Sequence, residues 1–220
     1  MARDLVIDPD DPRLGQLYPQ GLAAGFRRSG NLLYRPHCGQ CHACVPVRID
    51  CTRFAPNRSQ RRCLRRNADL QVRILPAGRT DERLRLYKRY LAQRHAGGGM
   101  DGHEGDDYDR FLGSDWARSR CLEIRGDGPE GAGSLLAVAV TDMCPNGLSA
   151  VYTYFDPTQA HRALGTLAIL QQVHWARASG LSHLYLGYWL EGHPKMAYKR
   201  HFSGLQAHDG LHWQDLPPVR

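Results

Sequence analysis

Residues 147–202 read GLSAVYTYFDPTQAHRALGTLAILQQVHWARASGLSHLYLGYWLEGHPKMAYKRHF. Leu148 to Phe155 is dense in β-branched and aromatic residues, which predicts a strand. Leu164 to Ala178 is apolar over most of a helix circumference, which predicts a mostly buried helix that Gly180 ends. His183 to Tyr188 predicts the next strand, and this order implies a right-handed crossover to a parallel neighbour. We therefore expect the active site here, because ligands of such sheets bind at strand ends.

A segment of mixed cations and aromatic residues, 189–202, follows the second strand. Aromatic rings stack on bases, and lysines and arginines meet backbone phosphates, so the mixture favours contact with a nucleic acid. The alternative is an amphipathic helix with Met196 and Tyr198 in the core and its cations in solvent. The spacing of the residues leaves both interpretations open.

The composition limits the classes of function. The chain has 220 residues and a formal net charge of +7, which favours an anionic partner or an acidic substrate, although many proteins with this balance bind neither. Its apolar runs fall far short of the roughly 18 residues of a membrane span, so we expect no membrane association and a cytoplasmic location. Seven cysteines is an odd number, and three have the spacing C-x2-C-x2-C, which in a reducing compartment favours metal ligands over disulfides.

The cysteine motif is the first chemical feature along the chain. It consists of Cys38, Cys41 and Cys44. Two-residue loops let neighbouring thiolates reach one metal ion, and His37, His42 or Cys51 could complete its coordination. The motif therefore predicts a zinc or iron–sulfur site, with three reduced thiols that pack a tight turn as the alternative.

A strongly basic helix is expected next. Residues 51–68 contain six arginines and no acid, and Asn57 is a good N-cap. Five arginines would then share one helical surface. They are Arg58, Arg61, Arg62, Arg65 and Arg66. Such like charges repel one another, and a phosphate backbone would offset the repulsion, so we predict that this surface binds RNA; a merely solvated basic face is the alternative.

The middle of the chain supplies an antiparallel meander. The patterns predict strands at 70–75, 120–125 and 133–142, a helix at 80–95 and a short helix at 107–112. Asn146-Gly147 is a strong hairpin signal between the last meander strands. The glycine-rich residues 96–102 are interpreted as a mobile substrate loop or, alternatively, as a plain surface connection.

This plan is that of the GNAT acyltransferases, so the expected fold class is α/β (α+β) with a GNAT-like core of meander and crossover. The crossover helix begins Arg162-Ala163-Leu164-Gly165, which partly matches the turn that cradles the coenzyme A pyrophosphate on backbone amides. Leu167 stands where Gly or Ala would admit the pyrophosphate. This bulk argues for an acyl donor other than acetyl-CoA.

A series of ordered motifs covers residues 25–213. They include Gly25-Phe26-Arg27-Arg28-Ser29-Gly30, Tyr34-Arg35-Pro36-His37-Cys38, Val45-Pro46-Val47-Arg48, Asn57-Arg58-Ser59-Gln60-Arg61-Arg62, Tyr185-Leu186-Gly187-Tyr188-Trp189 and Lys195-Met196-Ala197-Tyr198-Lys199. In these motifs the chain resembles the bacterial aspartate/glutamate leucyltransferases, relatives of the arginyl-tRNA–protein transferases of the N-degron pathway.

The resemblance implies an activity and a division of the chain. The activity is transfer of leucine from leucyl-tRNA, the co-substrate, to the α-amine of proteins that begin with Asp or Glu. The transfer marks these proteins for degradation. The resemblance implies that the reaction itself requires no cofactor. The division is a smaller cysteine-bearing subdomain, 1–76, and a GNAT-like catalytic domain, 77–220. Related eukaryotic enzymes use N-terminal cysteines for an iron–sulfur cluster. The rival functions are a CoA-dependent GNAT N-acetyltransferase and a non-enzymatic zinc or nucleic-acid-binding module.

The implied reaction needs an amine that loses a proton and is aligned with an activated ester. The candidate catalytic residues are Asp142 and Glu191 as orienting groups, His193 and His95 as bases, and Lys195. For Asp142, capping of a turn is the alternative. An acidic acceptor also requires a cation, because an unpaired carboxylate in a cleft is costly. The candidates for acceptor binding are Arg94, Lys195 and Lys199.

Four aromatic residues are candidates for stacking on the terminal adenosine of the tRNA. They are Tyr152, Tyr154, Tyr188 and Trp189. Packing in the protein core explains each of them about as well.

Overall fold

The computed structural model describes residues 3–94, 97, 102–127 and 133–217. Its strands are β1 (Asp4–Val6), β2 (Arg27–Ser29), β3 (Leu32–Pro36), β4 (Val45–Asp50), β5 (Gln71–Pro76), β6 (Ser119–Arg125), β7 (Leu135–Cys144), β8 (Gly147–Phe155), β9 (His183–Trp189), β10 (Leu205–His208) and β11 (Trp213–Asp215). Its α-helices are α1 (Leu14–Ala23), α2 (Arg58–Arg66), α3 (Asp81–Arg94), α4 (Gly105–Leu112) and α5 (Leu164–Ala178). Two 3-10 helices complete it, η2 (Pro157–Arg162) and η3 (Ala197–His201).

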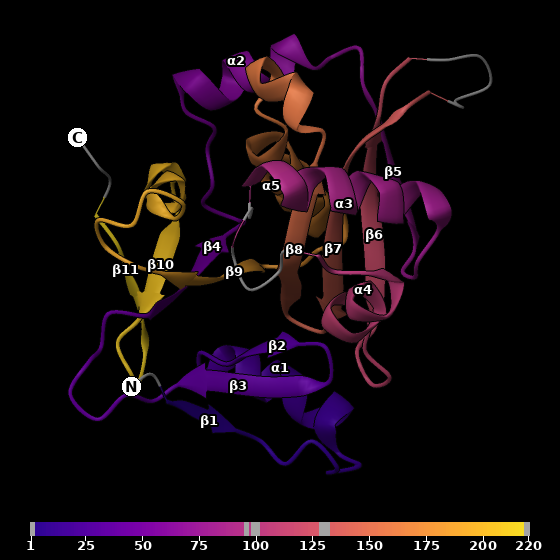
Figure 1. Cartoon of the computed structure of the whole chain (residues 1–220). Helices are drawn as coiled ribbons and strands as arrows, with labels where there is room; N and C mark the ends of the chain where they lie inside the picture. The colour runs from indigo at the N-terminus through magenta and orange to yellow at the C-terminus, as the bar shows by residue number, and fades with distance from the viewer. Residues whose placement is uncertain (1–2, 95–96, 98–101, 128–132, 218–220) are drawn as a thin grey trace.

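A large mixed sheet organises the molecule (Figure 1). Its eight strands lie in the order β11-β10-β4-β9-β8-β7-β6-β5. The strands β5 to β8 form the expected antiparallel meander, α5 crosses over, and β9 returns parallel to β8. The hairpin predicted at Asn146-Gly147 is confirmed, because Cys144 pairs with Gly147. The predicted crossover helix is also confirmed, with the bounds Leu164–Ala178.

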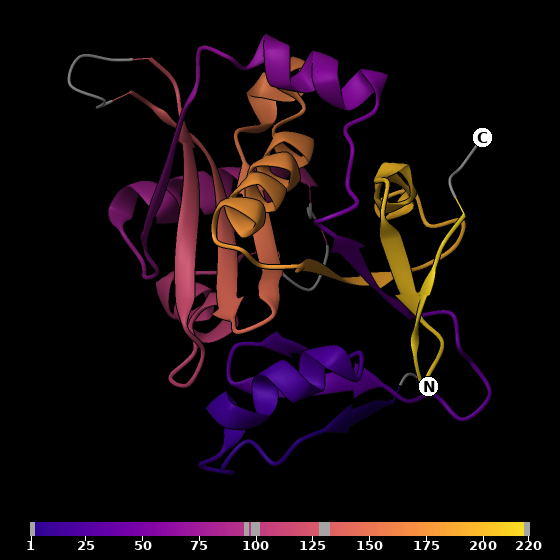
Figure 2. The same ribbon diagram turned by 180° about the vertical axis from the view of Figure 1, so that it is seen from behind.

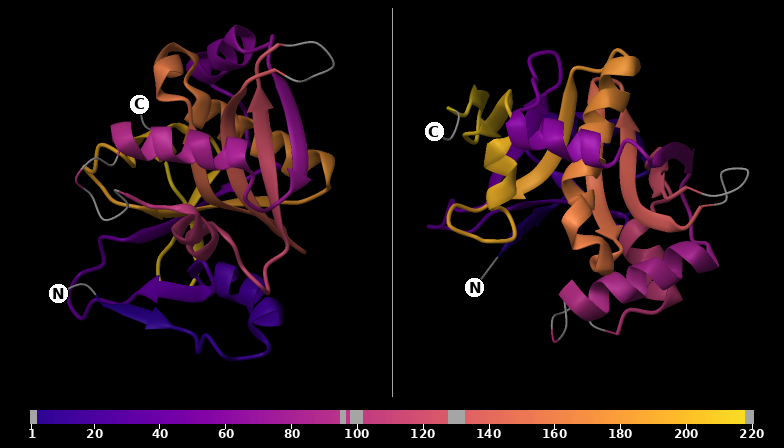
Figure 3. Two further views of the ribbon diagram at one scale, coloured as in Figure 1. Left: turned by 45° about the vertical axis from the view of Figure 1, so that its right-hand side comes forward. Right: turned by 90° about the horizontal axis from the view of Figure 1, so that it is seen from above.

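Helices cover both faces of this sheet, as Figures 2 and 3 show from several sides. Side chains alternate along a strand, so neighbouring residues of β7 enter different cores. Ala137 and Ala139 pack toward α5. Val138 and Val140 pack with the side chains of α3 and α4. The sheet is therefore buried on both faces, which explains why β7 reads as a continuous apolar run.

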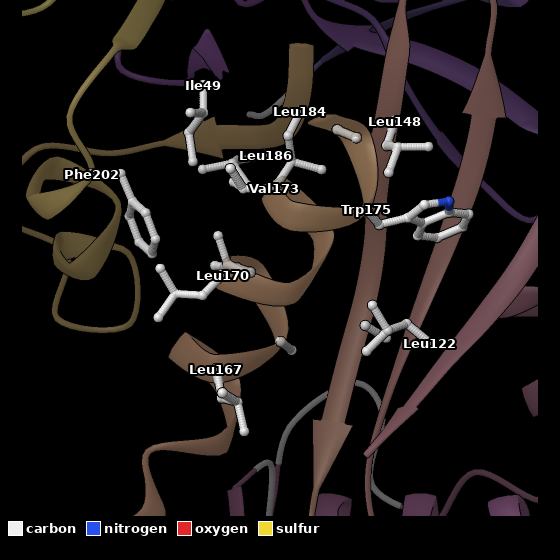
Figure 4. Close-up of a cluster of buried hydrophobic side chains, with 14 of the residues drawn as sticks. Ile49, Leu122, Leu148, Leu167, Leu170, Val173, Trp175, Leu184, Leu186 and Phe202 are labelled. Atoms are coloured by element: carbon white, nitrogen blue, oxygen red, sulfur yellow. The ribbon is translucent and has the colours of Figure 1, made fainter. Parts of the chain in front are cut away.

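The core under α5 is drawn in Figure 4. Leu167 belongs to it and is only 2% exposed. The expectation that Leu167 would obstruct a pyrophosphate at the start of α5 is therefore wrong, because its side chain is buried in the core cluster that α5 forms with the sheet. The argument that Leu167 disfavours coenzyme A does not hold.

A separate small unit precedes the large sheet. It is a three-stranded sheet in the order β1-β3-β2 with α1 packed on it (Figure 1). Its core includes Leu14, Tyr18 and Leu22 of α1, which pack together with Tyr185 of β9. Tyr185 lies between Leu184 and Leu186, which face α5. The unit therefore packs on the sheet face opposite α5.

The proposed division at residue 76 stays a prediction about folding units. The pairing of the strands bears on it, because β4 lies between β9 and β10, and β5 pairs with β6. Both strands come from the first 76 residues and belong to the large sheet. Among the residues described, no helix is long and apolar enough to cross a membrane.

Candidate functional site

The two parallel strands separate soon after they begin. β8 and β9 pair only between Gly147–Ser149 and His183–Tyr185. Beyond this point β8 continues to pair with β7 as far as Phe155, and β9 continues to pair with β4 as far as Trp189. We call the opening between the diverging halves the strand gap. It lies toward the carboxyl ends of two parallel strands, where sheets of this kind place their ligands.

Both strands are irregular where they diverge. On β8 the partner of Val140 is Tyr152 and the partner of Thr141 is Ala150, so Val151 is an extra, bulged residue. On β9 the register against β4 shifts between Pro46 and Arg48, and Gly187 there has a φ of +71°. Bulges re-aim the backbone and the side chains of a strand and recur beside active sites. Glycine adopts this φ without strain, so Gly187 in the sequence LGY allows β9 to bend at this point.

Lys199 of η3 lies against the bent segment of β9. Its ammonium donates a hydrogen bond to the Leu186 carbonyl oxygen at 2.8 Å and another to the Tyr188 carbonyl oxygen. The side chain is buried, with 7% of the residue exposed. Burial and the nearby charge of Arg27 lower the pKa of Lys199 to about 7. At neutral pH a large fraction of this group is therefore an uncharged amine, which can accept a proton.

Arg27 of β2 spans the strand gap from the small N-terminal unit. Its Nη2 donates to the Val151 carbonyl oxygen at 3.2 Å on one side. On the other side its Nη1 would lie 3.1 Å from a Cβ atom built on Gly187. Its Nε is buried without a hydrogen-bond partner. Arg27 and Lys199 thus bring a guanidinium and an amine to the same three residues of β9.

Aromatic side chains line the approach on the α3 side. Tyr198, next to Lys199, is 41% exposed. Tyr90 of α3 packs edge to face against Phe155 and Tyr152, with ring centroids 5.0 and 6.3 Å apart respectively. The guanidinium of Arg94 lies 6.0 Å from the centre of the Phe155 ring. This surface offers both ring faces and a positive charge.

The basic helix has the expected structure. Asn57 caps α2, because its side chain accepts from the Gln60 amide while the Gln60 side chain accepts from the Asn57 amide. The predicted RNA-binding arginines are all exposed. They are Arg58, Arg61, Arg62, Arg65 and Arg66. Within the described ranges none of the five forms a salt bridge with an acidic residue, so this positive surface is not neutralised by the protein itself.

Helix α2 is tied to the beginning of α5. Asn67 donates to the Arg162 carbonyl oxygen at 2.9 Å, and Arg162 forms a two-pronged ion pair with Asp69, both distances being 3.0 Å. Ala163 then adopts a left-handed conformation, with a φ of 53°, and α5 starts. The first turn of α5 contains no acidic residue, so its amides present the positive end of the helix dipole. The arginines of α2 and the start of α5 therefore lie next to each other.

Asp142 does not face the strand gap. Its carboxylate accepts from Arg28 at 2.5 and 2.8 Å, from Tyr18 at 2.8 Å and from Ser119 at 2.7 Å, and it is completely buried. These contacts join the small N-terminal unit to the large sheet. The predicted orienting role of Asp142 stays untested, and the contacts favour a structural one.

The other predicted catalytic residues occupy the turn after β9 or lie outside the described part. Glu191 is exposed, and the Nδ1 of half-buried His193 accepts from the Lys195 amide at 3.2 Å. Lys195 is exposed and donates from Nζ to the Arg94 carbonyl oxygen at 3.2 Å. Lys195 and Arg94 are therefore neighbours at the end of α3. His95 falls outside the described residues.

The aromatic candidates for base stacking divide into two groups. Tyr154 is completely buried and shares a 2.8 Å hydrogen bond with Tyr108, so packing describes it better than stacking does. Tyr188 is buried and donates to the Gly25 and Tyr34 carbonyl oxygens. Tyr152 and Trp189 are partly exposed and keep accessible ring surface.

The cysteine motif forms the loop between β3 and β4. Cys41 is exposed, and the Cys38 sulfur accepts from the Arg3 amide at 3.4 Å. Burial raises the pKa of Cys44, and the other two thiols of the motif raise it further. Among the described residues no group of three or more His, Cys, Asp or Glu side chains is arranged to hold a metal ion. A zinc or iron–sulfur site at these cysteines therefore stays a prediction, and we derive no step through one.

The residue that sequence reasoning missed as a site residue is Arg27. It appears in the motif Gly25-Phe26-Arg27-Arg28, where nothing distinguishes the two arginines locally. Successive side chains of β2 point to opposite faces, so the two arginines have different surroundings. Arg28 is buried and pairs with Asp142, whereas Arg27 points into the strand gap. The adjacency of β2 and β9 depends on long-range packing and is not encoded in a local pattern.

Comparisons with known proteins agree on one family. Residues 1–62 match the family model described as arginine-tRNA-protein transferase, N terminus, and residues 82–209 match the model for its C terminus. The chain is 59% identical over 217 residues to the aspartate/glutamate leucyltransferase of Stenotrophomonas maltophilia (strain K279a), covering 98% of this chain and 86% of the relative. It is 60% identical over 220 residues to the protein of that name from Xanthomonas campestris pv. campestris (strain B100), covering 100% and 87%.

A solved structure with a similar fold is a C-terminal DUF2156 domain from Agrobacterium fabrum. It superposes with a TM-score of 0.51 at 14% sequence identity and covers 84% of this chain and 54% of that one. At this identity the likeness concerns the fold alone.

Proposed function

Since this chain belongs to the arginine-tRNA–protein transferase family and resembles its aspartate/glutamate leucyltransferases, we propose that it transfers leucine from leucyl-tRNA to proteins that begin with Asp or Glu. The protein is an aminoacyltransferase. The observation that carries the proposed location of the reaction is the strand gap, with the buried amine of Lys199 at its edge. In keeping with the family, the products are substrates for the degradation machinery of the N-degron pathway.

We propose a GNAT-like core for the catalytic part. The support is the order of its elements: four antiparallel strands, the crossover helix α5, and a parallel strand β9 that diverges from β8. Sheets of this kind bind ligands at the carboxyl ends of their parallel strands, which is where the strand gap lies. The leucyl ester would therefore lie in the strand gap.

The tRNA is proposed to lie on the α5 side of the sheet. The exposed arginines of α2 supply positive charge for its backbone, and the nearby start of α5 supplies amides for a phosphate near its 3′ end. Trp189, which packs against the core under α5, remains our candidate for stacking on the terminal adenosine, whereas Tyr152 packs on the α3 face, opposite this tRNA. No cofactor is required, because the ester is already activated and the protein chiefly aligns it with the amine.

The proposed step begins when the acceptor's α-ammonium gives a proton to the neutral amine of Lys199. The freed nitrogen attacks the ester carbonyl carbon, so a C–N bond forms and the bond from that carbon to the ribose oxygen breaks. The attacking nitrogen loses a second proton, and the leaving ribose oxygen takes one up to become a hydroxyl. Lys199 releases its proton to solvent afterwards. A free α-amine has a pKa near 8, so a base with a pKa of about 7 is well matched to this transfer.

The test of this function is a donor and acceptor matrix. Purified protein is incubated with radiolabelled leucyl-tRNA, arginyl-tRNA or acetyl-CoA and with peptides that begin with Asp, Glu or Ala. We expect label on the Asp and Glu peptides from leucyl-tRNA alone. Labelling from acetyl-CoA would favour the acetyltransferase, a rival that Leu167 does not exclude because it lies in the core. No transfer from any aminoacyl-tRNA would contradict the proposal.

The role of α2 leads to a prediction about salt. Replacing both Arg61 and Arg62 with alanine should weaken binding of leucyl-tRNA, because two phosphate contacts are lost. The slope of log K against log salt should decrease by about 0.7–0.9 for each contact. Arg110→Ala is the matched control, since Arg110 is exposed on α4 at the opposite face. Equal binding and equal slopes in the two proteins would remove α2 from the tRNA site.

A further inference from the structure

The two arginines of β2 have opposite electrostatic environments. Arg28 is completely buried and pairs with the Asp142 carboxylate through Nε and Nη2. Arg27 is partly accessible, and within the described residues its side chain donates one hydrogen bond, to the Val151 carbonyl oxygen. In the described part of the chain no acidic side chain forms a salt bridge with Arg27. A guanidinium has five N–H donors, so most of its capacity is unused.

The surroundings of Arg27 add to this unbalanced charge. Its Nε is buried without a partner, which is costly for a charged group. The amine of Lys199 bonds to residues on both sides of Gly187, and Gly187 lies against the Arg27 guanidinium. The positive charge of Arg27 is one of the causes that lower the pKa of Lys199. The strand gap therefore has an excess of positive charge that an anion would relieve.

The position of Arg27 indicates which anion. Arg27 reaches the gap from the small N-terminal unit, which packs on the sheet face opposite α5. Helix α2 packs with α5 on the other face through Cys63, which leaves its basic surface exposed on that side. A tRNA backbone on α2 would not need Arg27. In an N-terminal Asp only two carbons separate the side-chain carboxylate from the α-amine. The cation that binds the carboxylate must therefore lie close to the base that takes the proton of the amine. Arg27 and Lys199 meet this condition.

Resting on the proposed function, we propose that Arg27 is the specificity-determining residue of the acceptor site and binds the side-chain carboxylate of an N-terminal Asp or Glu. The planar guanidinium can donate two parallel hydrogen bonds to a carboxylate. The side chain of an N-terminal Asn or Gln has the same shape as that of Asp or Glu but carries no charge. It would place its NH2 group, itself a hydrogen-bond donor, against an N–H of the guanidinium. The glycine at position 187 leaves the space beside the guanidinium free of a side chain.

The test compares acceptor selectivity in variants. Values of kcat/KM are measured with leucyl-tRNA and peptides that differ only in beginning with Asp or Asn, and likewise Glu or Gln. For the unchanged protein we expect a preference for the acid on the order of 10²-fold or more. Arg27→Met should reduce this preference to below about 10-fold, through loss on the acidic peptides, while the amide peptides change little. Arg27→Lys should keep part of the preference, because it keeps the charge but not the paired donors.

Arg110→Met is the comparison variant, since Arg110 is an exposed arginine of α4 that pairs with Asp107. We expect it to keep the preference. The ratio of two peptides measured on one preparation does not depend on how much of the protein is correctly folded. An unchanged ratio in Arg27→Met, or an equal loss on acids and amides, would overturn the inference while leaving the transfer activity established. A wild-type protein that transfers leucine to none of the peptides would overturn the proposed function itself, and this inference with it.

Discussion

Lys199→Met is expected to lower kcat for leucine transfer by about 10²–10⁴-fold, the usual range for loss of a positioned general base. Methionine keeps the length and apolar stem of lysine but has no nitrogen to accept a proton. The matched control is Lys88→Met, because Lys88 is partly exposed on α3 and forms an ion pair with Glu104 on the surface. Its kcat should stay within about twofold of the wild-type value, as is usual for exposed substitutions.

The pH dependence separates catalysis from a structural role. With a pKa of about 7, Lys199 becomes an effective base as the pH rises through 7, so kcat should rise there and level off above it. Lys199→Met should lose this limb. Lys199→Arg keeps a cation that donates hydrogen bonds but cannot deprotonate, and it should be as slow as the methionine variant. Full activity in Lys199→Arg would reject Lys199 as the base.

The same group affects stability in a defined direction. Its pKa is lowered from an ordinary value of 10.5 to about 7 in the folded protein. Between these pH values the unfolded chain binds a proton that the folded chain lacks, so the free energy of unfolding rises with pH by up to about 1.4 kcal/mol per unit. Lys199→Met should flatten this rise in denaturant titrations at pH 7.5 and 9. An unchanged slope would mean that Lys199 stays charged in the folded protein.

Arg28→Met is expected to lower the free energy of unfolding by about 3–5 kcal/mol. The reason is that Asp142 would remain as a buried carboxylate without its cation, at the joint between the small N-terminal unit and the large sheet. For a chain of this size, such a loss lowers Tm by about 6–20 °C. The measurement is chemical denaturation at neutral pH.

Two controls accompany this prediction. Arg13→Met removes an exposed ion pair with Asp11 and should change stability by less than about 1 kcal/mol. Replacing both partners, as in Arg28→Met with Asp142→Leu, should restore part of the loss, because no unpaired buried charge remains. An Arg28→Met protein as stable as wild type would show that Asp142 is not held by this pair, and would reopen its predicted role in orienting the substrate.

The sequence predicted elements whose signals are local. The bounds of α5, the strand β8, the cap of α2 by Asn57 and the hairpin before Gly147 all follow from patterns within a few residues. The segment 189–202 was ambiguous for the same reason. It contains turns and the short helix η3, with Lys199 buried and Tyr198 exposed, so neither of the two interpretations described it fully.

The features that create the site depend on distant contacts. Insertion of β4 between β9 and β10 joins residues more than 130 positions apart, and no periodicity signals it. The burial of Lys199 depends on the bend at Gly187, and the charge beside it comes from Arg27. Sequence patterns identified Lys199 as a cation for the acceptor. The patterns could not show that the pKa of Lys199 is low, because the main cause of the shift is burial in the folded protein.

The most direct test of the central claim is a structure of the protein with a non-hydrolysable donor mimic, 3′-leucylamido-3′-deoxyadenosine. We expect the leucyl carbonyl to lie in the strand gap, between Val151 of β8 and the Leu186–Tyr188 segment of β9, with the amine of Lys199 beside it. The adenine should then lie toward α5 and α2. A mimic bound elsewhere, with no part of it in the strand gap, would contradict the proposed site.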